Sequence, residues 1–124
     1  MADEIRTSIS FQVSKGGAAI ATGTLSDTID MTGADMGTVT QSIGTSNEAL
    51  DIPVDVTGDV HICIKNLDAT NYVGIYRDSG ATPSQLLSKL NPGESCFLSR
   101  VSHSAIYGMA NAAAVQIQLW VTEA

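Results

Sequence analysis

The sequence predicts an all-β fold, an antiparallel β-sandwich that is jelly-roll-like and has eight or nine strands. Apolar and polar residues alternate with a period of two in many short segments, and Gly- or Pro-containing turns separate those segments. No stretch of ten or more residues carries a clean helical period of 3.6. Because 124 residues suit one domain, we expect a single sandwich over residues 1–124, with residues 1–6 as an extended contact arm.

The first strong pattern predicts an N-terminal hairpin. Residues 5–13 alternate between an apolar and a polar face, which is typical of a half-buried strand. Gly16-Gly17 is a turn signal that leads into a second strand over 18–25, made of small residues. The face expected to be buried consists of Ile5, Thr7, Ile9, Phe11 and Val13.

The segment after the hairpin is harder to interpret. Ile29 and Met31 fit a short strand, and residues 32–35 resemble a loop. Alternation returns over 38–43 and again over 50–55. Pro53 has no N–H to donate, so the strand over 50–55 is expected at a sheet edge or at a bulge.

The remaining chain predicts strands over 60–65, 72–76, 95–101, 105–110 and 115–121. Residues 84–90 fit either one helical turn or a strand, and residues 91–94 carry the Pro-Gly pair of a type II turn. An immunoglobulin-like sandwich is the alternative, but its Cys…Trp…Cys order is absent because both cysteines precede Trp120. The side chains expected in the core are Val60, Ile62, Ile64, Val115, Ile117, Leu119 and Val121. On the same strands, the side chains expected to point away from the core are His61, Cys63, Lys65 and Trp120.

Charge and composition exclude several classes of protein. The net charge is −7 and no Lys/Arg cluster occurs, which argues against a nucleic-acid partner. No run of 18 apolar residues exists, so we expect no membrane helix, and the N-terminus lacks the pattern of a secretory signal. Cys63 and Cys96 are expected as free thiols, although one disulfide stays open. The whole net charge lies in residues 1–59, where a solvated surface is favoured over a face for a positive partner.

No catalytic or metal-binding pattern is convincing. His103 lies between Ser102 and Ser104, where a Ser–His pair is conceivable, but a polar loop histidine is the simpler interpretation. The carboxylates of residues 27–35 lack the register of a calcium loop, and His61 with Cys63 supplies too few ligands for a metal. The Gly-rich residues 33–37 have no strand–loop–helix context and are not a phosphate loop. We therefore expect no enzyme, no cofactor and no metal.

Residues 66–124 resemble small virion proteins of tailed bacteriophages. The resemblance lies in the order and spacing of several β-turn phrases rather than in one motif. These phrases are Asn66-Leu67-Asp68-Ala69-Thr70-Asn71-Tyr72-Val73-Gly74-Ile75, Leu90-Asn91-Pro92-Gly93-Glu94, Leu98-Ser99-Arg100, Ala105-Ile106-Tyr107-Gly108-Met109-Ala110, Ala112-Ala113-Ala114 and Val121-Thr122-Glu123.

This resemblance implies a capsid decoration (cement) protein, a jelly-roll module that forms homotrimers and bridges neighbouring major capsid proteins. It implies location on the virion, after assembly in the cytoplasm of the bacterial host. A tail, neck or fibre component and a glycan-binding sandwich are the alternatives. The contact residues expected for the capsid are Ala2, Asp3, Glu4, Ile5, Arg6, Asp27, Asp30 and Asp35, and Trp120 is expected to mark a surface for self-association.

Overall fold

The structure, a computed structural model, describes residues 4–31, 33 and 35–124. Two compact units divide the chain, Met1–Thr32 and Gly33–Ala124. The sequence predicted one sandwich over residues 1–124, whereas the structure has two compact units.

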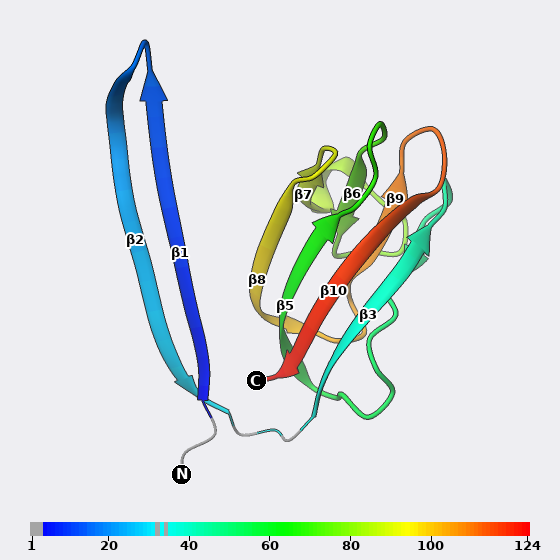
Figure 1. Ribbon diagram of the computed structural model, residues 1–124. Helices are drawn as coiled ribbons and strands as arrows, with labels where there is room; N and C mark the ends of the chain where they lie inside the picture. Colours follow the sequence, from blue (N-terminus) through cyan, green and yellow to red (C-terminus); the bar gives the residue numbers. More distant parts are fainter. Residues whose placement is uncertain (1–3, 32, 34) are drawn as a thin grey trace. The chain divides into compact units, whose positions relative to one another are not determined.

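The first unit is an antiparallel hairpin of β1 (Glu4–Lys15) and β2 (Ala18–Asp30), as predicted (Figure 1). Lys15 pairs with Ala18, so the loop holds only Gly16 and Gly17, whose φ angles are 61° and 82°. Positive φ at both positions is the requirement of a type I′ turn, which glycine meets without strain. β2 runs five residues beyond its predicted end and absorbs Ile29, which was expected on a separate short strand.

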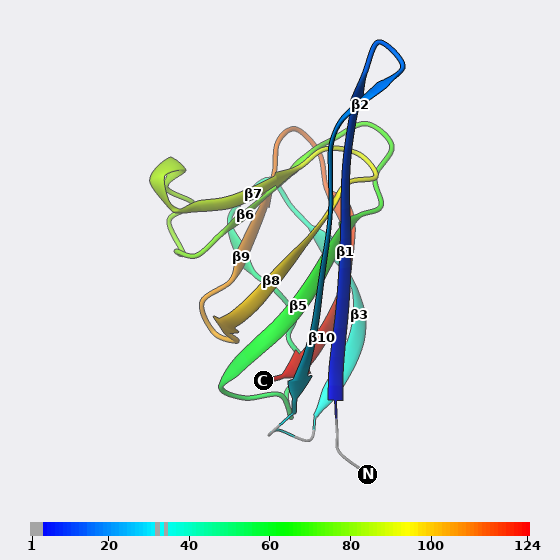
Figure 2. The ribbon, with the colours of Figure 1, turned by 90° about the vertical axis from the view of Figure 1, so that its left-hand side faces the viewer.

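The second unit is a sandwich of two four-stranded antiparallel sheets, in the orders β3-β10-β5-β8 and β4-β9-β6-β7 (Figures 1 and 2). The first four of these strands pair with the last four in reverse chain order, which is the pairing of a jelly roll. The prediction of an antiparallel, all-β sandwich is confirmed. The eight strands are β3 (Met36–Ile43), β4 (Glu48–Ala49), β5 (Asp59–Asn66), β6 (Val73–Tyr76), β7 (Leu86–Leu90), β8 (Ser95–Ser102), β9 (Tyr107–Ala110) and β10 (Val115–Glu123).

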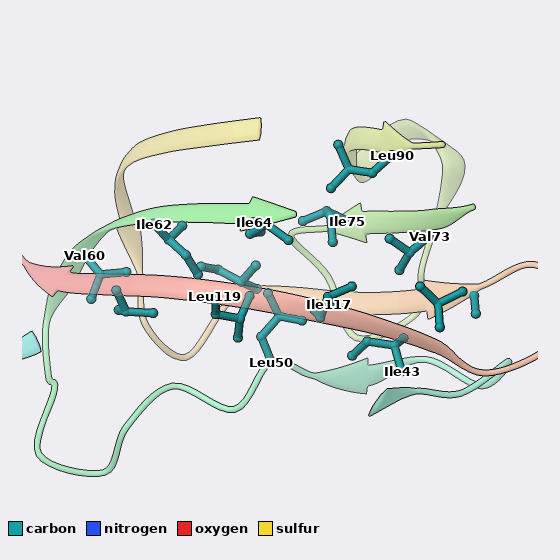
Figure 3. Close-up of a cluster of buried hydrophobic side chains, with 14 of the residues drawn as sticks. Ile43, Leu50, Val60, Ile62, Ile64, Val73, Ile75, Leu90, Ile117 and Leu119 are labelled. Atoms are coloured by element: carbon teal, nitrogen blue, oxygen red, sulfur yellow. The ribbon is translucent and has the colours of Figure 1, made fainter. Parts of the chain in front are cut away.

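Alternate side chains of these strands meet between the two sheets and form the core (Figure 3). β10 lies between β3 and β5 and contributes four inward residues, all predicted. Each apolar side chain buried in this way adds roughly 1.5–3 kcal/mol to stability. The predicted core residues that are buried are Val60, Ile62, Ile64, Val115, Ile117, Leu119 and Val121.

One predicted strand, over residues 50–55, is wrong. This segment forms local bonds instead: the Ile52 N–H donates to the Leu50 carbonyl over 2.9 Å, and the Val56 N–H to the Pro53 carbonyl over 2.9 Å. Leu50 and Val56 are buried and anchor the two ends, while Val54 is exposed between them. Alternation over six residues was outweighed by Pro53, which removes a ladder donor at the centre of the segment.

Two further segments agree with their sequence patterns. Residues 84–90 combine both alternatives, because a 3₁₀ turn over Pro83–Gln85 precedes β7. In the turn at residues 91–94, the Glu94 N–H donates to the Asn91 carbonyl over 2.9 Å. Gly93 has a φ of 79°, as the third position of a type II turn requires.

Replacing Leu119 with alanine tests the packing of the core. Leu119 is fully buried on the central strand, so Leu119→Ala should lower the free energy of unfolding by about 2–5 kcal/mol. Urea titration followed by Trp120 fluorescence measures the loss. Gln116→Ala, on the exposed face of the same strand, is the control and should change stability by less than about 0.5 kcal/mol. Equal effects of the two variants would contradict the assigned faces.

Candidate functional site

The hairpin separates its side chains into an apolar and a polar face. The register pairs Ile9 with Leu25 and Phe11 with Gly23 on one face. Between these positions lie Ser8 opposite Ser26 and Ser10 opposite Thr24, on the other face. We define the hairpin apolar face as Ile5, Ile9, Phe11, Val13, Ala21, Gly23, Leu25 and Ile29.

A two-stranded ribbon contains one layer, so it has no second sheet of its own to cover such a face. Within this face Phe11 is 65% exposed and Leu25 is 70% exposed. Neither strand has a proline, and the chain carries no charge between Arg6 and Lys15 or between Lys15 and Asp27. Long, flat, uncharged strands without proline are those that readily accept another strand. The hairpin therefore has the properties of a docking element.

The residues predicted at the N-terminus lie at the start of β1. Arg6 and Glu4 form an exposed ion pair with 2.6 Å between the guanidinium and the carboxylate. Ile5 belongs to the hairpin apolar face and pairs with Ile29. Ala2 and Asp3, which were also predicted as contacts, lie outside the described residues.

The three aspartates predicted as capsid contacts lie in two different units of the chain. Asp27 and Asp30 lie on β2, where they pair with Thr7 and Glu4 and therefore occupy opposite faces. Asp35 precedes β3 in the other unit, where its carbonyl accepts a hydrogen bond from the Glu123 N–H over 3.0 Å. Across the described residues, no three His, Cys, Asp or Glu side chains lie close enough together to bind a metal ion.

Trp120 lies on the outer face of the β3-β10-β5-β8 sheet, as its alternation predicted. Its cross-strand neighbours are Thr38 on β3 and Cys63 on β5, and Phe97 on β8 lies opposite Cys63. These four residues form a row across the sheet, in which Trp120 is 44% exposed. An exposed tryptophan suits a contact surface, because its ring buries a large area when covered.

A Ser–His pair is present, but it involves His61 and not His103, the histidine considered in the sequence analysis. Ser99 and Arg100 together oppose the single residue His61, so β8 has a bulge next to β5. The bulge places the Ser99 hydroxyl 3.0 Å from Nδ1 of His61. His103 instead donates from Nδ1 to the Gly58 carbonyl over 2.9 Å. A bulge leaves no clear mark in the alternation pattern, so the pair at Ser99 was missed.

The environment of His61 favours the neutral imidazole. The ring is 2% exposed, and it stacks on Phe97 with 6.1 Å between ring centroids. Burial, together with the nearby positive charge of Arg100, lowers the pKa of His61 below 6.5. Nε2 has no hydrogen-bond partner among the described residues. Among the described residues, the imidazole ring of His61 hydrogen-bonds the hydroxyl of Ser99 and no carboxylate. It therefore has no Asp or Glu partner there of the kind that orients a catalytic histidine.

Both cysteines are free thiols, which answers the question left open by the sequence. Cys63 lies beside Trp120 on the outer face, whereas Cys96 packs against the core on the inner face. Burial raises the pKa of the Cys63 thiol, and burial is also the main cause of the raised pKa of the Cys96 thiol. A raised pKa keeps a thiol protonated and weakly reactive near neutral pH.

Comparisons with protein-family models, with curated proteins and with solved structures found no match for this chain. Among the described residues, no helix has the length and apolar character needed to cross a membrane. The surfaces described above must therefore be interpreted from their own geometry.

The pKa of His61 is lower in the folded chain than its ordinary value of 6.5. When the pH falls below 6.5, the unfolded chain therefore binds more protons than the folded chain. The free energy of unfolding should therefore decrease between pH 7.5 and about 5.5, as measured by urea titration. His61→Phe, which does not titrate, should flatten this dependence. His103→Gln leaves His61 in place and should retain it, so the same flattening in both variants would contradict the assignment.

Proposed function

We propose that this chain is a structural assembly protein of a bacteriophage virion, most specifically a capsid decoration protein. The observation that carries the assembly role is the hairpin apolar face, which no layer of the hairpin itself covers. A face of this kind gains stability when a further layer covers it, and a neighbouring subunit of an assembly can supply that layer.

The sandwich unit supports a binding role rather than catalysis. Its Ser99–His61 pair has no carboxylate partner among the described residues, and its outer sheet face presents Trp120. A jelly roll is a fold that viral capsid proteins use widely, although lectins and enzymes use it too. The virion assignment therefore rests on the resemblance of residues 66–124 to small virion proteins of tailed bacteriophages.

In such a role the protein bridges major capsid proteins that lie on either side of a seam. Many copies act together on a symmetric particle, so weak individual contacts add up to strong attachment. The acidic residues near the base of the hairpin, Glu4, Asp27 and Asp30, favour a partner surface with positive groups.

Mass spectrometry and electron cryomicroscopy of purified particles of the encoding phage test the proposal. We expect the chain in stoichiometric amounts, with its density on the capsid shell. Density on the tail or neck would instead indicate a tail, neck or fibre component and would contradict the decoration role. Absence of the chain from purified particles would overturn the proposal altogether.

Deletion of residues 1–6 should reduce occupancy of the particle, because it removes the start of β1 and the Glu4–Arg6 pair. Occupancy is measured by adding purified variants to particles that lack the protein. Gln116→Ala, on the sandwich unit, is the matched control and should bind as the unmodified chain does. Unchanged occupancy after the deletion would exclude this segment from the contact.

A further inference from the structure

We propose that the outer face of the β4-β9-β6-β7 sheet binds a proline-rich segment of a partner protein in the polyproline II conformation. The inference concerns the sandwich unit alone and goes beyond the proposed virion role, on which it does not depend. We define the tyrosine face as the outward strand residues of this sheet together with Tyr72, which directly precedes β6: Ala49, Tyr72, Gly74, Tyr76, Leu86, Lys89, Tyr107 and Met109.

All three tyrosines of the chain lie on this face, and two of them are cross-strand neighbours. Val73 and Ile75 are fully buried in the core, so Gly74 and Tyr76, which alternate with them on β6, point outward. The register places Tyr107 of β9 opposite Tyr76, and β9, β6 and β7 lie side by side (Figure 2). The two rings therefore share one side of the sheet.

Lys89 connects Tyr72 to the same face. Its register partner on β6 is Gly74, and its ammonium lies 4.2 Å from the centre of the Tyr72 ring. A cation over one side of an aromatic ring is attracted to that ring, so Lys89 helps to orient Tyr72. Met109 of β9 pairs with Gly74 from the other side. Tyrosine and methionine are side chains that interface centres favour.

Gly74 gives the ring of Tyr76 its position. A Cβ built on Gly74 would lie 2.6 Å from Cε2 of Tyr76 and 2.8 Å from its Oη. The ring therefore leans along β6 with its hydroxyl end over the glycine, where any side chain would displace it. Tyr76 is nevertheless only half-buried, so part of its ring is open to a partner.

The tyrosine face can donate hydrogen bonds at several points but offers few acceptors. The hydroxyls of Tyr72 and Tyr76 bond no other residue that the structure describes, and both reach solvent. The Tyr107 hydroxyl donates to the Ser104 carbonyl over a long 3.4 Å. The ammonium of Lys89 can only donate. Among the described residues that define this face, none carries a carboxylate or an amide side chain.

A proline-rich segment complements such a face. Proline has no N–H, and a polyproline II backbone makes no internal hydrogen bonds, so its carbonyls are open to donors and it brings few donors of its own. Aromatic side chains receive the proline rings in this mode of recognition, and the ligand loses little entropy because it is already extended. A regular strand or a saccharide brings donors, for which this face has few acceptors.

The spacing of two tyrosines also suits this ligand. Tyr72 and Tyr76 are four residues apart, which is about 13 Å in an extended chain. The hydroxyl end of Tyr76 reaches back to Gly74, two residues nearer to Tyr72, so the rings lie roughly 7–13 Å apart. Two prolines three residues apart in a polyproline II segment are separated by about 9 Å. Prolines on one side of such a segment can therefore contact both rings.

Titration of the isotope-labelled, full-length chain with decaproline, followed by NMR, tests the proposal. We expect saturable shifts at concentrations up to about 1 mM, with the largest at the backbone amides of Gly74, Lys89 and Met109. A glycine–serine peptide of the same length is the control ligand and should cause no shift. The outer face of the other sheet, around Trp120, should stay unaffected.

Four variants locate the site. Tyr76→Ala removes the ring, and Gly74→Ala displaces the ring while it keeps every group of the face. Each should raise the Kd for decaproline at least about tenfold. Tyr76→Phe keeps the ring without the hydroxyl donor and should raise the Kd about two- to tenfold. Trp120→Ala removes an exposed aromatic ring from the other sheet and, as the matched control, should leave the Kd unchanged.

Every outcome bears on the proposal. An absence of saturable shifts overturns it, and so does binding that Tyr76→Ala and Gly74→Ala leave unchanged or that the glycine–serine peptide reproduces. Shifts with cellohexaose alone would assign the face to a saccharide, and shifts with protein concentration alone would assign it to a second copy. Either result also overturns the proposal. Unchanged amide resonances of β10 show that each variant is folded, and none of these results affects the virion role.

Discussion

An apolar sheet face is stable in water only when a second layer covers it, and the whole chain is organised by this constraint. In the sandwich, the inward residues of β10, such as Ile117 and Leu119, are covered by the opposite sheet. In the hairpin, the same alternation produces an apolar face, but a single ribbon has no opposite sheet. In the sandwich the covering layer belongs to the same unit, whereas the hairpin unit by itself has none.

The polar groups inside the sandwich illustrate a related constraint. Asn66 is fully buried, and its Nδ2 donates to the carbonyls of Asn71 and Leu90 over 2.9 and 3.0 Å. Its Oδ1 accepts from the Asp68 N–H over 2.8 Å, so this side chain connects the loop after β5 to β7. His61 differs from Asn66, because its Nε2 has no partner among the described residues.

Most strands could be predicted because each carries its own period-two pattern and its own turn signals. The hairpin, β5, β8 and β10 follow directly from local alternation. The segment over 50–55 alternates equally well, yet its backbone bonds are local because Pro53 prevents continuous pairing. The Ser99–His61 pair depends on a bulge that shifts the register between two distant strands. Such a shift concerns how strands pair, and the pattern of either strand alone does not contain it.

The sequence by itself determined which residues form strands and which face of each strand is apolar, because these depend on neighbours one or two positions apart. It also placed Trp120 outward and the inward residues of β10 in the core. Only the tertiary structure decided that residues 33–124 pair in jelly-roll order and that residues 4–30 form a separate hairpin. Those outcomes depend on contacts between segments far apart in the chain, whose energies exceed any local preference.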